Sequence, residues 1–276
     1  MYFLFSTIRR VRPDLRTAHI SLTDLSQICQ RIDERNFIQY RDITIRTDYI
    51  SKAEGSAMVS VGGTTVLAGV KAQIGTPFSN APDKGIIITN TELLAIASRH
   101  FEYGPPNKFA VEISRVVDRT IREAPLIDLE KLCIVEGSKV WKLHIDINIL
   151  DFDGNLMDAA CLAAVSALLT TKIPAIKFVN DEISIDTDHL TKLPIKNRSV
   201  LCTVVKINDK MIVDPLYVEE TLMDASLSIG FREDGTLCAI QKCGLNILTA
   251  QEVMQSMNIA FNMSRELFSI LDTINQ

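Results

Sequence analysis

The chain has 276 residues, of which 47% are hydrophobic and 23% charged, so it is not a disordered chain and can form one large domain or two closely joined halves. Its net charge of −5 argues against a protein that binds nucleic acid over its whole surface, because such surfaces are basic. The apolar run from 159 to 169 is too short to span a bilayer, and the first five residues are too few for a signal-peptide core. We therefore expect a soluble, intracellular protein with no membrane partner.

The six cysteines and four histidines are scattered, with no Cys-x-x-Cys pair and no spacing typical of zinc ligands. Most of the cysteines lie inside apolar stretches. We expect reduced thiols within the core, and neither a metal site nor a cofactor.

The N-terminal half predicts a β-rich structure. Residues 1–20 contain a proline and show no period, which predicts a variable leader, and a short helix is expected from 21 to 32. Alternation predicts a strand over 40–46, and two further strands, 57–61 and 64–71, form a hairpin. A loop-rich stretch from 75 to 106 is interrupted by a strand at 86–88.

The segment from 108 to 122 predicts an amphipathic helix with a basic outer strip. Apolar residues recur at helical spacing, while Glu112, Arg115, Arg119 and Arg122 fall on the other face. Arg115 and Arg119 are four residues apart and therefore lie side by side. A solvated surface explains this strip without any ligand, and contact with RNA is the alternative.

The middle of the chain predicts strands at 132–135 and 140–152, then a helix from 157 to 169 that is buried on nearly every side. A polar loop is expected from 180 to 197. Strands at 200–207, 211–213, 225–231 and 237–241 precede a long helix from 250 to 274. The order of strands followed by a helix occurs twice, which suggests two halves, 21–175 and 196–274.

The turn from Asp153 to Asp158 joins a strand to the buried helix. A helix N-terminus attracts anions, and a phosphate site there usually adds a hydroxyl or a guanidinium. This turn offers Leu156 and Met157, which cannot bond a phosphate. We expect the carboxylate of Asp158 to satisfy the helix dipole and to repel a second anion.

Six segments, taken in chain order, resemble the RNase PH family, and more narrowly the non-catalytic branch that forms half of the exosome ring: 55–57, 63–66, 81–85, 104–106, 115–119 and 150–160. The resemblance runs from about 31 to about 272. It implies an α+β fold of the RNase PH type, with a ribosomal protein S5 domain 2-like core and an RNase PH C-terminal region. Within that branch, segment 81–85 and the short C-terminus favour one eukaryotic member.

Active members of this family cleave RNA from its 3′ end with inorganic phosphate, which needs positioned cations. The resemblance places their phosphate loop on Asn155, Leu156 and Met157, and their second phosphate-binding arginine on Phe109. Both cations are missing at these positions. It also places their two catalytic aspartates on Asp214 and Glu220.

These last two carboxylates have two interpretations. Glu220 is one methylene longer than aspartate, enough to damage a positioned reaction. Equally, 213–220 could be an acidic loop that satisfies nearby backbone or a neighbouring subunit's arginine. The family's Arg-x-Asp-Gly-Arg motif is altered to Arg31-Ile32-Asp33-Glu34-Arg35, and the loss of its glycine puts the local turn in doubt.

Three functions follow from these observations. The resemblance implies an inactive subunit of a six-subunit exosome ring with related subunits, S1/KH cap proteins and RNA in its channel as partners, located in the nucleus, nucleolus and cytoplasm. Arg115 and Arg119, with Lys108, would contact RNA phosphates. An active phosphate-dependent 3′-to-5′ exoribonuclease that uses Asp214 and Glu220 is the enzyme alternative, and an adaptor or metabolic protein unconnected with RNA is the third.

Overall fold

A computed structural model describes residues 31–179 and 182–275 of the chain. The chain divides into two compact units, Met1–Asn36 and Phe37–Gln276. The expected leader and the expected helix at 21–32 lie outside the described residues, except for the last two positions of that helix, which are not helical.

The described part of the first unit contains a tight turn. The backbone N–H of Glu34 donates to the carbonyl of Arg31 at 3.1 Å, and Glu34 has a φ of 62°. This is the left-handed region that glycine prefers. The turn therefore forms although glutamate stands where the family motif has glycine.

The second unit is built on a six-stranded sheet in the order β1-β2-β3-β6-β4, with β5 paired to β6. All its pairs are antiparallel except β4 with β6. Its strands are β1 (Ile43–Thr47), β2 (Gly55–Val61), β3 (Thr64–Gly75), β4 (Ile86–Leu93), β5 (Cys133–Val135) and β6 (Lys139–Asp151). The predicted strands are confirmed, and β4 is longer than the sequence pattern predicts.

The second sheet has four strands in the order β10-β9-β11-β12, all antiparallel. They are β9 (Ser199–Ile207), β10 (Lys210–Val213), β11 (Ala225–Arg232) and β12 (Leu237–Cys243). A third sheet pairs only β7 (Lys172–Val179) with β8 (Glu182–Lys192). The prediction of a loop from 180 to 197 is wrong over β8. Neither strand of this hairpin packs in a larger sheet, so neither needs the apolar face by which a strand is recognised.

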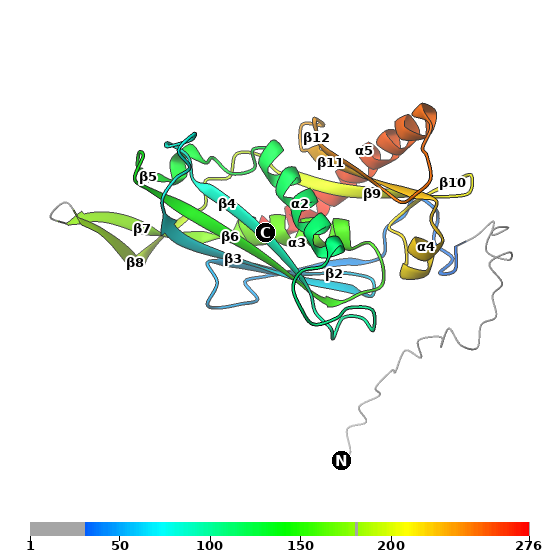
Figure 1. Cartoon of the computed structure of the whole chain (residues 1–276), viewed down its shortest axis with the longest axis horizontal. Helices are drawn as coiled ribbons and strands as arrows, with labels where there is room; N and C mark the ends of the chain where they lie inside the picture. The colour runs from blue at the N-terminus through cyan, green and yellow to red at the C-terminus, as the bar shows by residue number, and fades with distance from the viewer. Residues whose placement is uncertain (1–30, 180–181, 276) are drawn as a thin grey trace, which may run out of the picture. The chain divides into compact units, whose positions relative to one another are not determined.

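The helices pack on the two larger sheets (Figure 1). They are α2 (Lys108–Glu123), α3 (Leu156–Thr170), α4 (Tyr217–Leu222) and α5 (Ala250–Asp272), with short 3₁₀ turns η1 (Glu130–Leu132) and η2 (Thr273–Asn275). Helix α2 packs on β4, α3 packs on β2 and β3, and α5 packs on β9 and β11. None of the helices in the described part of the chain is long and apolar enough to cross a membrane.

Helix α3 is the centre of the core. Every residue from Leu156 to Leu168 is buried, because β2 and β3 of the first sheet cover one side of the helix and β9 of the second sheet covers another. The prediction of a helix buried on nearly every side is confirmed. This packing brings the turn before α3 against the second sheet and α4.

Candidate functional site

The positions to which the sequence assigns a lost phosphate site line a single cavity. Phe109 from α2, Asn155, Leu156 and Met157 from the start of α3, and Glu220 from α4 surround a cavity of about 400 Å³. Neither lysine nor arginine is among the described residues that line it. The structure therefore brings these positions together and gives them a largely apolar environment.

The turn before α3 has a constrained backbone. Gly154 has a φ of 85° and Asn155 a φ of 55°, so two successive residues are left-handed. A Cβ on Gly154 would lie 2.3 Å from the carbonyl oxygen of Pro215, and the carbonyl of Gly154 accepts a hydrogen bond from Oγ1 of Thr64 at 2.6 Å. The close approach of these two segments leaves room only for glycine.

Asp214 is fully buried and paired with Arg41 of the same chain. Oδ1 of Asp214 accepts from one terminal guanidinium nitrogen of Arg41 at 2.8 Å. Oδ2 accepts from Nε and from the backbone N–H of Arg41, each at 2.8 Å. Burial alone would raise the pKa of Asp214. The hydrogen bonds from Arg41 and its positive charge outweigh burial and hold this pKa below its usual value. A neighbouring subunit's arginine is not needed to satisfy this carboxylate.

Arg41 reaches further, to the turn before α3. Its second terminal nitrogen donates to the carbonyl of Asp153 at 2.6 Å. This guanidinium therefore joins Asp214 to the turn, and its charge is neutralised within the chain.

The expected acidic loop at 213–220 is in part the helix α4, which contains both Glu219 and Glu220. Glu219 accepts from the backbone N–H of Leu216 at 2.8 Å, and Glu220 accepts from the backbone N–H of Asn155 at 2.7 Å. Burial raises the pKa of Glu220 to about 7. The prediction that these acids satisfy nearby backbone is confirmed. The prediction of a loop is wrong over residues 217–220, which are helical.

Asp158 lies at the centre of a buried polar network. Its carboxylate accepts from Tyr40 Oη at 2.7 Å, from the backbone N–H and Oγ1 of Thr203, and from Nδ2 of Asn155 at 3.1 Å. Burial raises the pKa of Asp158 to about 6. As expected, Asp158 stands in the first turn of α3, where its carboxylate faces the positive end of the helix dipole, and it also joins the start of the helix to Tyr40 and Thr203.

The basic strip on α2 is exposed at Lys108, Arg115 and Arg119. Arg115 lines two adjoining surface hollows of about 670 and 360 Å³, and Arg119 lines the smaller of them. Among the described residues, neither arginine has an ion-pair partner. Both guanidinium groups are therefore available to a polyanion.

Glu112 and Arg122 differ from this strip. Glu112 lines the 400 Å³ cavity, where its Oε1 accepts from Gln241 and Cys243. The expectation that Glu112 lies on the outer strip is therefore wrong. Arg122 forms two hydrogen bonds to Asp118, so its charge is largely neutralised.

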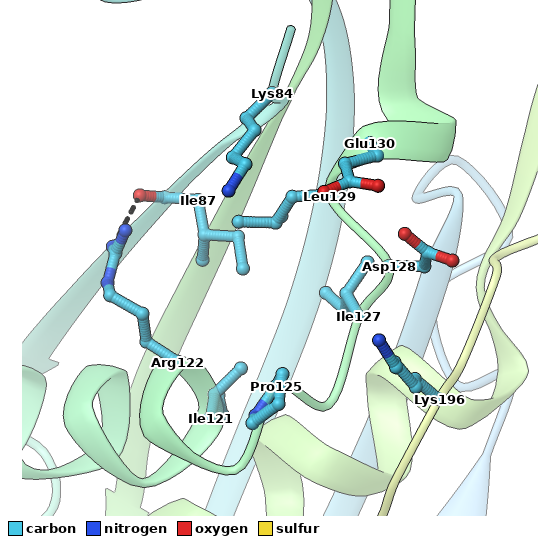
Figure 2. Close-up of a pocket in the computed structure, with 10 residues that line it drawn as sticks. All are labelled: Lys84, Ile87, Ile121, Arg122, Pro125, Ile127, Asp128, Leu129, Glu130 and Lys196. Atoms are coloured by element: carbon cyan, nitrogen blue, oxygen red, sulfur yellow. Dashed lines mark hydrogen bonds between the residues drawn. The ribbon is translucent and has the colours of Figure 1, made fainter. Parts of the chain in front are cut away.

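A smaller pocket of about 190 Å³ lies beside Arg122 (Figure 2). Arg122 donates to the carbonyl of Ile87 at 3.2 Å across one edge of this pocket, while Asp128 and Glu130 lie on the side opposite Arg122. The mixture of charges offers no clear preference for an anion. The pocket therefore adds nothing to the basic strip.

Sequence reasoning missed Arg41, Tyr40 and Thr203. Each lies in a strand or just before one, in a pattern that predicts only a sheet. Their partners lie between 45 and 173 residues away. No local spacing could have identified these contacts.

Comparison with known proteins gives two matches to family models. Residues 39–174 match the first domain of the 3′ exoribonuclease family, named RNase_PH, and residues 197–263 match its second domain. The predicted fold, an RNase PH N-terminal core with an RNase PH C-terminal region, is confirmed.

Named relatives cover most of the chain. It is 49% identical to "Exosome complex component Rrp42" of Methanothermobacter thermautotrophicus, over 91% of this chain and 93% of that protein. It is 47% identical to the protein of that name from Thermococcus gammatolerans, over 88% and 89%.

Solved structures of archaeal exosomes contain chains that are similar to this one. A chain of the Archaeoglobus fulgidus exosome with RNA bound to the active site superposes with a TM-score of 0.82 at 41% identity, covering 87% of this chain and 92% of that chain. A chain described as "Archaeal exosome core" gives 0.78 at 37% identity, covering 90% and 92%.

Proposed function

Because this chain belongs to the RNase PH family of 3′ exoribonucleases, we propose that it is a subunit of an exosome core ring, where it helps to build the RNA channel without itself catalysing phosphorolysis. Relatives called Rrp42 and two archaeal exosome structures support membership of the ring. Other RNase PH-like subunits would be its ring neighbours, and S1/KH proteins would cap the ring.

The observation that carries the proposed inactivity is the environment of the 400 Å³ cavity. Phosphorolysis needs cations beside the attacking phosphate, whereas Phe109, Leu156 and Met157 stand at the mapped positions. Asp214 is fully buried and bound by Arg41, which opposes proton transfer by its carboxylate. An active phosphate-dependent exoribonuclease is the alternative.

Activity is tested on the purified chain, alone and in an assembled ring. We expect no release of nucleoside diphosphates when the chain alone is incubated with RNA, phosphate and magnesium. Diphosphate release that is lost in Asp214→Asn, with folding retained, would establish the enzyme alternative. Copurification with related subunits at a defined mass tests ring membership separately.

RNA would contact the basic strip of α2. Arg115 and Arg119 are exposed, adjacent and without carboxylate partners among the described residues, and Lys108 adds a third charge on the same helix. Each phosphate contact also releases counterions, so binding should weaken as salt rises.

The test compares charge-matched variants in the assembled ring. We expect Arg115→Ala and Arg119→Ala each to weaken RNA binding by about tenfold at low salt and to lower the slope of log affinity against log salt by about 1. Arg122→Ala removes the same charge from the same helix but should leave the slope unchanged, because Asp118 already neutralises Arg122. Equal slopes in all variants would refute this part of the proposal.

Two finer predictions remain. Segment 81–85 favours exosome complex component eight, also called ribosomal RNA-processing protein 43, whereas the named relatives are archaeal Rrp42 proteins. The expected location in nucleus, nucleolus and cytoplasm would be tested by microscopy in the source cells. Archaeal relatives belong to cells without a nucleus, so this prediction applies only to a eukaryotic source.

A further inference from the structure

The largely apolar lining of the 400 Å³ cavity at the start of α3 contains a few hydrogen-bond acceptors. In Glu112 and in Glu220, one carboxylate oxygen accepts a hydrogen bond within the chain, and the other has no hydrogen-bond partner among the described residues. Asn155 is only 1% exposed, and its side-chain oxygen has no partner there. A ligand that supplies N–H donors would satisfy these acceptors, whereas an anion would be repelled.

Aromatic rings form another part of the same lining. The ring of Phe152 lies 5.3 Å from that of Phe101 and 5.2 Å from that of Tyr217, and Tyr217 stacks on His100 at 5.7 Å between ring centroids. Such rings attract organic cations through their negative faces and also pack against apolar groups. The volume falls within the range of about 300–1,000 Å³ that is typical of small-molecule sites.

We propose that this cavity binds a small organic cation, an ammonium group on an apolar or aromatic body, with Glu112 and Glu220 as its counter-ions. The ammonium donates to the two carboxylates, and the body packs against Phe109, Phe152 and Tyr217. Burial holds the pKa of Glu220 near 7, and a bound cation would lower that pKa by stabilising the ionised form. On this proposal the cavity binds amines and not phosphate.

Benzylammonium is a suitable probe, with benzyl alcohol as the neutral analogue of nearly equal shape and benzoate as the anionic one. Methionine methyl NMR on the full chain gives a local readout, since Met157 and Met223 line the cavity while Met254 lies elsewhere on α5. At pH 8 we expect benzylammonium to shift the Met157 and Met223 signals but not that of Met254. It should bind about tenfold more tightly than benzyl alcohol, and benzoate should not bind.

Substitutions identify the counter-ions. Glu112→Gln and Glu220→Gln keep the shape and the acceptor of each side chain but remove its charge, and each should weaken benzylammonium binding by about tenfold. Glu92→Gln is the matched control, because Glu92 is exposed and does not line this cavity. Phe109→Arg would place a cation in the cavity and abolish amine binding.

Three results would overturn the proposal: equal affinity for benzyl alcohol, tighter binding of benzoate, or affinity unchanged in both glutamine variants. None of them depends on RNA. Arg115 and Arg119 do not line this cavity, so the two proposals can fail separately.

Discussion

Nδ2 of Asn155 donates to Oδ1 of Asp214 across 2.8 Å, and both residues hold a left-handed backbone, with φ of 55° and 49°. The same amide also donates to Asp158. Asn155 therefore joins two buried carboxylates from different segments. Asparagine suits this position because it tolerates the left-handed region better than most side chains and supplies two amide hydrogens.

We expect Asn155→Ala to lower the free energy of unfolding by about 2–4 kcal/mol, because two buried carboxylates each lose a donor and alanine is strained at this φ. Urea denaturation measures the change. Asn155→Gly also removes the amide but relieves the backbone strain, so it should cost about 1 kcal/mol less. An alanine variant as stable as the original protein would contradict this role.

Arg41→Met should lower the free energy of unfolding by about 3–5 kcal/mol, because it leaves the buried carboxylate of Asp214 without its cation. Adding Asp214→Asn should recover part of the loss, which a double-mutant cycle measures. The control is Arg46→Met in β1, an exposed arginine whose removal should cost at most about 0.5 kcal/mol. No coupling between Arg41 and Asp214 would exclude this explanation.

Stability should depend on pH through Glu220 and Asp158. Burial raises their pKa values to about 7 and about 6, so between about pH 4 and 7 the folded chain binds more protons than the unfolded chain. Their contribution is therefore fully present below pH 4 and is lost as pH rises through the folded pKa values. The contribution of Asp214 depends on pH in the opposite direction. Because its pKa is lowered in the folded chain, Asp214 contributes stability at neutral pH that is lost in acid.

Glu220→Gln isolates one of these groups. Glutamine can still accept the N–H of Asn155 but never ionises, so we expect the variant to gain about 1–3 kcal/mol over the original chain at pH 8 and little at pH 5. Urea denaturation at the two pH values provides the comparison. The same gain at both would mean that ionisation of Glu220 is not the cause.

Two glycines with similar backbones provide a matched pair. Gly154 and Gly137 have φ of 85° and 72°, but only at Gly154 would a Cβ meet other backbone atoms, whereas at Gly137 it would meet nothing within 4 Å. Gly137→Ala should cost about 1 kcal/mol from backbone strain, and Gly154→Ala about 2 kcal/mol more. Thermal unfolding tests the difference, and equal losses would show that the contact with Pro215 can relax.

Local pattern predicted the elements that pack on a large surface. Strand β6 alternates apolar and polar residues because one of its faces packs on the core, and α3 is apolar all round because sheets cover it on more than one side. Strand β8 and helix α4 were missed for physical reasons as well. The first pairs in an isolated hairpin, and the second is a short helix with charged residues.

Part of the candidate site was predicted from the family resemblance and not from local pattern. The family resemblance identified Phe109, Asn155 and Glu220, which the fold brings to one cavity. It did not identify Arg41, whose partner Asp214 is 173 residues away. Glu34 shows a different limit of sequence reasoning. Glutamate has no special preference for the left-handed region, yet Glu34 adopts it in a turn closed by its hydrogen bond to the carbonyl of Arg31.

The position of α3 also has a consequence for the order in which the protein is made. Helix α3 emerges from the ribosome before β9. The face of α3 that β9 later covers is therefore exposed to solvent while the next 28 residues, 171–198, emerge. During that interval the nascent chain carries an apolar helix with a missing neighbour, the kind of surface that chaperones bind. A pause while residues 171–198 are emerging from the ribosome should therefore favour aggregation, whereas a pause once β9 has fully emerged should not.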